Sequence, residues 1–243
     1  VQSQAGRLLL ADKKYDEALV RLKKATELDP RNTRALVALG DYYLAFEDWD
    51  NALEMLSRAE SLSRYHPARV IGHSEARLEL GRDLPEALAD LEGLPKAAEI
   101  PTALQGRYAL MLGRAQSANG KHDDAIKTLG EGQPLYTQYG LEFAMALGHA
   151  QRAAGLMAQA QKSFEDALKL APKSEAAKEG LGRVFLARSR EKELIDRIRG
   201  EKDARKVALM RGIAYFRLGE AKKARAELQS TQVNGKYPAE AAV

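Results

Sequence analysis

A glycine recurs along this chain at intervals near 34 residues, and a small residue usually stands 12 positions after it. Successive positions of that second residue are 34, 35, 38, 35, 34 and 30 residues apart. The glycines and their followers are Gly6 with Ala18, Gly40 with Ala52, Gly113 with Ala125, Gly148 with Ala160, Gly182 with Leu194, and Gly212 with Ala224. A seventh unit is degenerate, since Glu75, beside Ser74, takes the place of the glycine that would precede Ala87. Such a period is the signature of stacked structural repeats.

Each repeat contains the pattern of two helices. In the first repeat, Ala18, Leu22, Ala25 and Leu28 recur at helical spacing, and Pro30 ends that helix. A second stripe begins at Thr33 and predicts a helix over 33–44. No useful stretch alternates with period two, so we expect no strands. The sequence therefore predicts an all-α fold in which a glycine lies where two helices cross, because a glycine inside a helix is otherwise unfavourable.

The residues that carry chemistry are scarce or scattered. The 243 residues include no Cys, which excludes a disulfide framework, a thiolate nucleophile and a Cys-based zinc site. The histidines His66, His73, His122 and His149 form no His-x-x-x-His pair, so we predict no metal site. Gly180-Leu181-Gly182-Arg183 lacks the third glycine and the preceding strand of a dinucleotide site. We predict no catalytic residue, no cofactor and no enzyme activity.

The repeat resembles the tetratricopeptide repeat family, whose signature places Leu-Gly, Tyr, Ala, Phe, Ala and Pro at set offsets. The best match runs over Leu147-Gly148, Gly155, Ala160, Phe164, Ala167 and Pro172. The first repeat matches at Gly6, Tyr15, Ala18, Leu22, Ala25 and Pro30, and the second at Leu39-Gly40, Tyr43, Trp49, Ala52, Leu56 and Ala59. The resemblance covers essentially the whole chain.

The resemblance implies an α-solenoid, a right-handed superhelix of about seven helix pairs with a concave groove. We expect one solenoid over residues 1–243. Its repeats would be approximately 1–32, 33–67, 68–105, 106–140, 141–174, 175–204 and 205–238, with 239–243 starting a further helix. Neither end carries the polar cap that terminal repeats need, so we expect the natural protein to extend on both sides.

Two repeats depart from the pattern. In the third, Pro85 opens a second helix that ends near Leu94, and residues 95–101 form an inserted loop between Pro95 and Pro101. In the sixth, residues 191–199 form a short second helix, and Leu194 replaces the small alanine. These departures bend the array or shape a partner-specific pocket.

In this family the first helix of each pair lines the groove, which identifies candidate binding residues in register with the glycines. The candidates are Arg7, Val37, Asp41, Leu110, Arg114, Met145, His149, Arg152, Arg183, Leu209, Phe216 and Arg217. The apolar members would anchor a ligand or, alternatively, form interhelical core. The arginines resist burial and indicate either ligand contacts or solvated surface.

The family's chaperone-binding members hold a terminal carboxylate with Lys and Asn in these rows. Here those places hold Ser3, Arg7, Val37 and Asp41, which argues against that clamp. Residues 1–121 carry net charge −1 and residues 122–243 carry +5, so a basic groove end would attract an acidic segment.

The leading hypothesis is a non-catalytic protein–protein interaction scaffold that binds a peptide or helix with apolar, acidic character in its groove. We expect a bacterial role in complex assembly, secretion or regulation. The alternatives are an RNA-binding helical repeat or the substrate-recruiting domain of a larger enzyme. We expect no DNA partner. No targeting segment is present, and no apolar run is long enough to span a membrane, so we expect a soluble protein of the bacterial cytoplasm or periplasm; its oligomeric state stays open.

Overall fold

The computed structural model describes residues 2–62, 66–94, 99–198 and 205–231, and every regular element in these ranges is helical. The helices are α1 (Gln2–Ala11), α2 (Tyr15–Leu28), α3 (Thr33–Ala45), α4 (Trp49–Leu62), α5 (Pro67–Leu80), α6 (Leu84–Glu92), α7 (Thr102–Ala118), α8 (His122–Leu135), the 3-10 turn η2 (Thr137–Tyr139), α9 (Gly140–Ala153), α10 (Met157–Leu170), α11 (Glu175–Ala187), α12 (Glu191–Arg197), α13 (Arg205–Arg217) and α14 (Ala221–Gln229). The fold is an all-α solenoid of helix pairs, and none of the described helices is long and apolar enough to cross a membrane.

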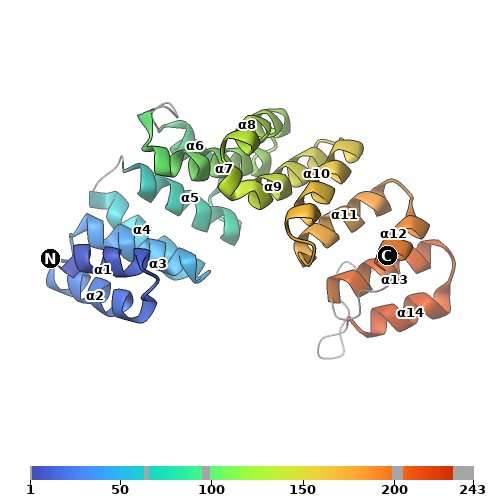
Figure 1. Ribbon diagram of the computed structural model, residues 1–243, viewed down its shortest axis with the longest axis horizontal. Helices are drawn as coiled ribbons and strands as arrows, with labels where there is room; N and C mark the ends of the chain where they lie inside the picture. The colour runs from blue at the N-terminus through green and yellow to red at the C-terminus, as the bar shows by residue number, and fades with distance from the viewer. Residues whose placement is uncertain (1, 63–65, 95–98, 199–204, 232–243) are drawn as a thin grey trace. The chain divides into compact units, whose positions relative to one another are not determined.

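The chain divides into two compact units, residues 1–128 and 129–243, with the boundary inside α8. In unit 1, α1 pairs with α2, α3 with α4, and α5 with α6 (Figure 1). The first helices α1, α3, α5 and α7 also contact one another in succession, and each second helix contacts the first helix that follows it. Unit 2 repeats this arrangement with α9, α11 and α13 as first helices. Each unit therefore buries a core between two layers of helices.

The recurring glycines make room for a large side chain of the partner helix. A methyl group added to Gly40 would lie 2.6 Å from the Cγ atom of Leu56, and one added to Gly148 would lie 2.8 Å from the ring of Phe164. The same relation, at the same offset along the sequence, joins Gly6 to Leu22 and Gly212 to Leu228. The alanines that follow these glycines in the repeat pattern are buried. The helices thus pack through a side chain that enters the glycine notch, not through bare contact of two backbones.

The two irregular repeats show how a notch is replaced. In the third, Ser74 is fully buried and its hydroxyl donates to the carbonyl of Ala87 across the helix pair, at 3.3 Å. In the sixth, α12 has only seven residues, and Gly182 faces Leu194 and Met210. Pro85 lies in the first turn of α6, as predicted, and α6 ends at Glu92. Part of the loop predicted at 95–101 and part of the repeat predicted at 205–238 lie outside the described residues, as do residues 239–243.

Candidate functional site

The surface formed by α1, α3, α5 and α7 is here called the first-helix face of unit 1. It contains a pocket of about 110 Å³, lined by Arg7, Thr33, Arg34, Val37, Ala38, Asp41, His66 and Ala68. Regular spacing brings these residues together, because Arg7 and Asp41 each follow the notch glycine of their own helix by one residue. Three of the predicted groove residues, Arg7, Val37 and Asp41, meet in this pocket.

A charged network borders the pocket and links three first helices. The guanidinium of Arg107, on α7, donates from Nε and Nη2 to Glu75 Oε2 on α5, at 2.9 and 2.5 Å. Its Nη1 atom lies 3.6 Å from Asp41 Oδ1 on α3. Burial would lower the pKa of Arg107, but the carboxylates of Glu75 and Asp41 outweigh burial and raise it. Arg107 therefore stays charged and neutralises two partly buried acids.

Asp41 keeps capacity to bind a further group. Burial raises the pKa of its carboxyl group, and the neighbouring Arg107 opposes that rise. Among the described residues, no donor makes a hydrogen bond to its buried Oδ1 atom. This atom lies beside Arg107 and is screened from solvent, so a ligand would meet the exposed part of the Asp41 side chain, which is 32% exposed.

The other charges at the pocket are positive. Arg7 and Arg34 are exposed, and no ion pair to either is found in the described part of the chain. Burial, followed by the charges of Arg69, Arg7 and Arg34, lowers the pKa of His66, so this imidazole is neutral at pH 7. The pocket thus presents two available guanidinium groups around a small apolar floor.

The remaining predicted residues are distributed differently. Leu110 and Leu209 are buried in the core, and Val37, on the floor of the pocket, is also only 7% exposed. All three therefore pack between helices, which is the interhelical alternative for the apolar rows. Met145 is half-buried against the unit 2 core, and His149 is exposed with its imidazole edge-on to Phe164 at 5.1 Å. Arg152 is half-buried, and Phe216 is 52% exposed. None of the pockets described in unit 2 contains these residues together.

Three predicted groove arginines already have partners within the chain. Arg114 donates to Glu79 Oε1 at 2.6 Å, and Arg183 donates to Glu179 Oε1, one turn earlier on α11, at 2.9 Å. Arg217 donates to the carbonyl oxygen of Leu186 at 2.8 Å and lies 3.6 Å from Glu191. These partners reduce the charge that the three arginines offer to a ligand.

Sequence reasoning missed Arg34 and Arg107. Both lie six residues before the notch glycine of their helix, one turn ahead of the row that contains Val37 and Leu110. Extending the register by one further helical turn would have found them, because residues three apart share a helix face.

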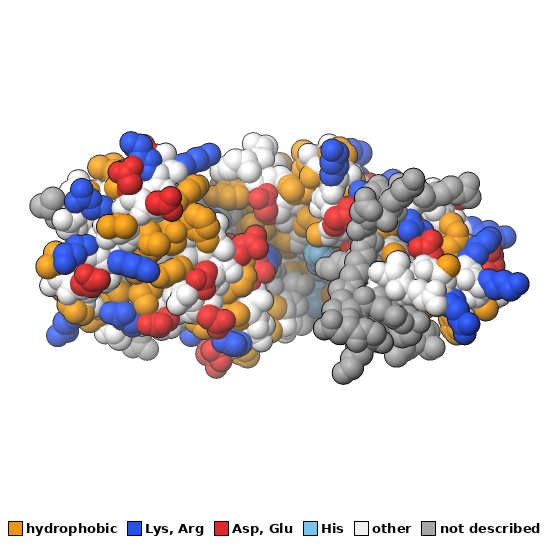
Figure 2. Space-filling model, turned by 90° about the horizontal axis from the view of Figure 1, so that it is seen from below, with side chains coloured by type: hydrophobic (Ala, Val, Ile, Leu, Met, Phe, Trp, Pro, Cys, Tyr) orange, Lys and Arg blue, Asp and Glu red, His pale blue; other side chains and the backbone are white. Residues whose placement is uncertain are grey.

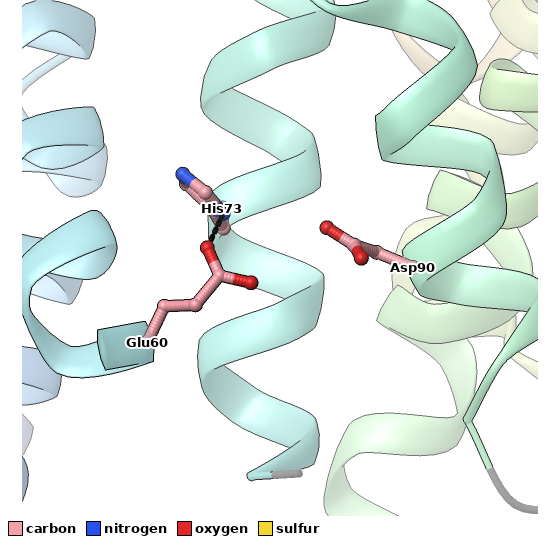
Figure 3. A group of neighbouring side chains, drawn as sticks. All are labelled: Glu60, His73 and Asp90. Carbon is pink, nitrogen blue, oxygen red and sulfur yellow. Dashed lines mark ion pairs between the residues drawn. The ribbon is translucent and has the colours of Figure 1, made fainter. Parts of the chain in front are cut away.

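A second cluster joins α4, α5 and α6 on the other side of α5. Potential ligand atoms of Glu60, His73 and Asp90 lie within 4.8 Å of one another. Figure 3 shows the three side chains, with the ion pair between His73 and Glu60 as a dashed line. The imidazole of His73 is buried, with Nε2 3.0 Å from the hydroxyl of Ser57 and Nδ1 3.4 Å from Glu60 Oε2. Burial, with Arg77 and Arg69 nearby, lowers the pKa of His73 to about 3. One imidazole and two carboxylates are a donor set that zinc accepts.

The charges of this cluster are already balanced by arginines. The buried Arg69 lies 3.4 Å from Glu60 Oε1, and Arg77 donates to Asp90 Oδ2 at 2.7 Å. Two guanidinium groups thus supply the positive charge that a metal ion would bring. A divalent cation added here would leave excess positive charge in a low-dielectric site. The arrangement serves as an ionic bridge between three helices.

A further pocket lies at the irregular sixth repeat. It has a volume of about 220 Å³ between α10, α11 and α12, and it is lined by Leu168, Pro172, Lys178, Leu181, Gly182, Phe185, Leu194, Arg197 and Ile198. The second helix α12 is half as long as α10, so it covers less of the apolar layer beneath it.

Comparison with known proteins identifies the repeat. Two family models described as tetratricopeptide repeat match residues 9–70 and 145–193. No curated protein matches the chain.

Solved structures share the fold at low sequence identity. A tetratricopeptide repeat protein from Parabacteroides merdae is 15% identical, with a TM-score of 0.67 over 96% of this chain and 93% of that one. YrrB, described as a tetratricopeptide repeat protein with an unusual peptide-binding site, is 18% identical, with a TM-score of 0.54 over 72% of this chain and 88% of its own. Human IFIT1, solved as a dimer with m7Gppp-AAAA, is 15% identical, with a TM-score of 0.70 over 95% of this chain and 58% of its own.

The repeat period, the notch that joins Gly6, Gly40, Gly148 and Gly212 to a large side chain of the next helix, and the two family matches lead to one assignment. The chain contains tetratricopeptide repeats, which the family models match over residues 9–70 and 145–193.

Proposed function

We propose that this chain is a non-catalytic scaffold that binds a segment of a partner protein on the first-helix face of unit 1. Tetratricopeptide repeat arrays serve in general as protein–protein interaction scaffolds, and YrrB is described as having a peptide-binding site. The carrying observation is the pocket in which exposed Arg7 and Arg34 surround Val37 and the partly exposed carboxylate of Asp41.

The chemistry of the pocket defines the segment that would fit. Its apolar floor accepts a small or medium aliphatic side chain, since its volume is about 110 Å³. Arg7 and Arg34 favour a carboxylate beside that side chain, because a guanidinium group binds a carboxylate through two parallel hydrogen bonds. The exposed part of the Asp41 carboxylate would accept a backbone N–H of the same segment. The preferred sequence therefore contains an aliphatic residue flanked by Asp or Glu.

A displayed random-peptide library, selected on the full chain, tests this proposal directly. We expect the selected peptides to share an acidic–aliphatic motif, and we expect Arg7→Glu and Arg34→Glu each to weaken a selected peptide roughly tenfold in fluorescence anisotropy. The matched control is Lys162→Glu on α10, an exposed charge reversal far along the chain, which should leave binding unchanged. Equal losses in all three variants, or no common motif, would reject the site.

RNA binding is the competing function, because IFIT1 was solved with a capped oligonucleotide. The same face argues against it here, since Asp41 and Glu75 stand within the row that would meet phosphates, and Arg107 is neutralised by both. A single-stranded oligoadenylate is the informative probe. Salt-dependent binding that Arg7→Glu and Arg34→Glu abolish would replace the peptide proposal with an RNA one.

A further inference from the structure

The outer surface of α2 carries an unusual residue at its centre. Val20 is 67% exposed, on the side of α2 opposite to Ala18, Leu22 and Ala25, which are buried in unit 1. Val20 follows the small residue of its repeat by two positions. The corresponding exposed residues of the other second helices are Glu54, Ala89, Lys127, Lys162, Asp196 and Ala226. Only the first repeat places a branched apolar side chain here.

The charges around Val20 are arranged with opposite signs on its two sides. Asp16 and Glu17 lie one turn before it, and Lys23 and Lys24 lie one turn after it. All four side chains are exposed and line the same shallow surface as Val20. Arg21, directly beside Val20 on the same surface, donates to the side-chain oxygen of Gln2 on α1 at 3.1 Å. Figure 2 looks onto the side of unit 1 where α2 lies in Figure 1, and charges of both signs stand there among hydrophobic side chains.

The charge pattern of α2 is complementary to the same pattern on a second copy of α2 that runs antiparallel to it. If two copies of α2 pack antiparallel about a two-fold axis at Val20, Glu17 of each lies on the same side of the interface as Lys24 of the other, and Asp16 lies on the same side as Lys23. The two Val20 side chains meet on the axis. Such an isologous contact makes every ion pair twice, so the pattern provides four intermolecular pairs around an apolar centre.

Helix stability alone does not account for the whole pattern. Acidic residues in the first turn and basic residues in the last turn stabilise any helix through its dipole. That effect explains Asp16 and Glu17, but it gives no reason for an exposed valine midway between the charge pairs. Within α2 these charges make one weak ion pair, Lys24 with Glu27 at 3.6 Å, in which both side chains are more than half exposed. The charges are thus available to a second molecule.

We propose that α2 is a self-association surface, through which two copies of this chain form an antiparallel, two-fold symmetric dimer centred on Val20. This surface is separate from the pocket around Asp41, because Val20 lies on the second-helix side of unit 1. The dimer leaves both first-helix faces open and doubles the number of binding sites presented to a partner.

Sedimentation equilibrium on the full chain tests the charge pairing. We expect concentration-dependent dimerisation that weakens with salt, and a dissociation constant raised roughly tenfold or more by Glu17→Lys or by Lys24→Glu, because each creates two like-charge contacts. The double variant Glu17→Lys/Lys24→Glu reverses both pairs and should restore the dimer to within about threefold of the native constant. The matched control, Lys162→Glu on α10, should have no effect.

A disulfide trap tests the position of the axis. The chain contains no cysteine, so Val20→Cys introduces a single thiol. Helices packed about 8–10 Å apart place facing Cα atoms about 4–6 Å apart, which suits a disulfide. We expect Val20→Cys to oxidise to a covalent dimer at least about tenfold faster than Lys162→Cys. A chain that stays monomeric into the millimolar range, a double variant that fails to recover, or equal oxidation rates would overturn the proposal.

Discussion

Helices α5 and α11 hold corresponding places in their units but bind their neighbours differently. The second helix before α5 packs Leu56 against Gly72, and the second helix before α11 packs Phe164 against Gly180. In both cases the glycine stands two positions before the small residue of the repeat, which is Ser74 in α5 and Gly182 in α11. One residue after that small residue stand Glu75 in α5 and Arg183 in α11. Glu75 pairs with Arg107 of the next first helix, whereas Arg183 pairs with Glu179 of its own helix.

The residue four positions earlier decides between these two outcomes. In α11 that residue is Glu179, which satisfies Arg183 within one turn. In α5 it is Ile71, which is fully buried and cannot pair, so Glu75 extends to the neighbouring repeat. At α5, charge therefore joins neighbouring first helices where the local partner is missing. At α11, apolar packing and the hydrogen bond from Arg217 to the carbonyl oxygen of Leu186 join the helix to α13.

The largest expected effect is a loss of stability that distinguishes the ion pairs between helices, made by Arg107, from the ion pair within one helix, made by Arg183. Arg107→Ala would leave Asp41 and Glu75 without their cation, and we expect it to destabilise unit 1 by about 3 kcal/mol, the low end for a buried pair because these side chains stay 22–32% exposed. Arg183→Ala removes a pair within one helix, in which Arg183 is 42% and Glu179 16% exposed, and should cost less than about 1 kcal/mol. Hydrogen exchange resolved by helix would measure both, and equal losses of protection would remove the distinction.

The second prediction concerns the glycines that accept a side chain. A methyl group on Gly180 would overlap the ring of Phe164, which is fully buried, so we expect Gly180→Ala to destabilise unit 2 by about 2 kcal/mol after its gain in helix propensity. Gly72→Ala should be nearly neutral, since the nearest atom is the flexible tip of Leu44 at 3.0 Å. Urea denaturation monitored by circular dichroism measures both variants. Phe164→Leu, which copies Leu56, should recover part of the loss, and a failure to do so would mean that another contact limits this notch.

The third prediction uses the residue just before the small position, which is His73 in α5 and the buried Leu181 in α11. The pKa of His73 falls from 6.5 to about 3 in the folded chain, so the unfolded chain binds the extra proton between these values. Stability is therefore complete above pH 6.5 and declines as the pH falls toward 3, by about 1.4 kcal/mol per pH unit. The groups that face His73 are Glu60, Ser57, Arg69, Arg77 and Asp90.

His73→Leu gives α5 the residue type of α11 and should remove this slope from the pH dependence of the unfolding midpoint. The control is Leu181→Val, a substitution in the core of unit 2. It should shift the unfolding midpoint by the same amount at all pH values. A slope that survives in His73→Leu would assign the pH dependence to other groups.

The glycine period was sufficient to predict the helix pairs. The helix expected over 33–44 is α3 at Thr33–Ala45, and the short second helix expected from Glu191 is α12. These features depend on local propensity and on spacing along one chain, which a sequence displays directly.

The glycine period does not predict which charged side chains pair with one another. Arg114 was interpreted as available to a ligand, but it binds Glu79, which belongs to the preceding repeat. Likewise, Glu60, His73 and Asp90 come from three helices and share no motif spacing. Whether such side chains meet depends on how far one helix pair is rotated against the next, and the repeat length does not contain that angle.

The smallest predicted effect lies in the turns that follow α5 and α11. Both turns need a left-handed residue; α5 is followed by Gly81 with φ of 63°, but α11 by Ser189 with φ of 53°. A side chain is strained in this conformation, so Ser189→Gly should stabilise unit 2 by about 0.5–1 kcal/mol, and Gly81→Ala should destabilise unit 1 by about 1 kcal/mol. Both residues are exposed, and nothing lies within 4 Å of a methyl group added to Gly81, so packing contributes little. Thermal unfolding of the two variants therefore measures the free energy of the strained turn conformation alone. Shifts of the unfolding temperature in the same direction for both variants would show that the greater flexibility of glycine in the unfolded chain outweighs turn strain.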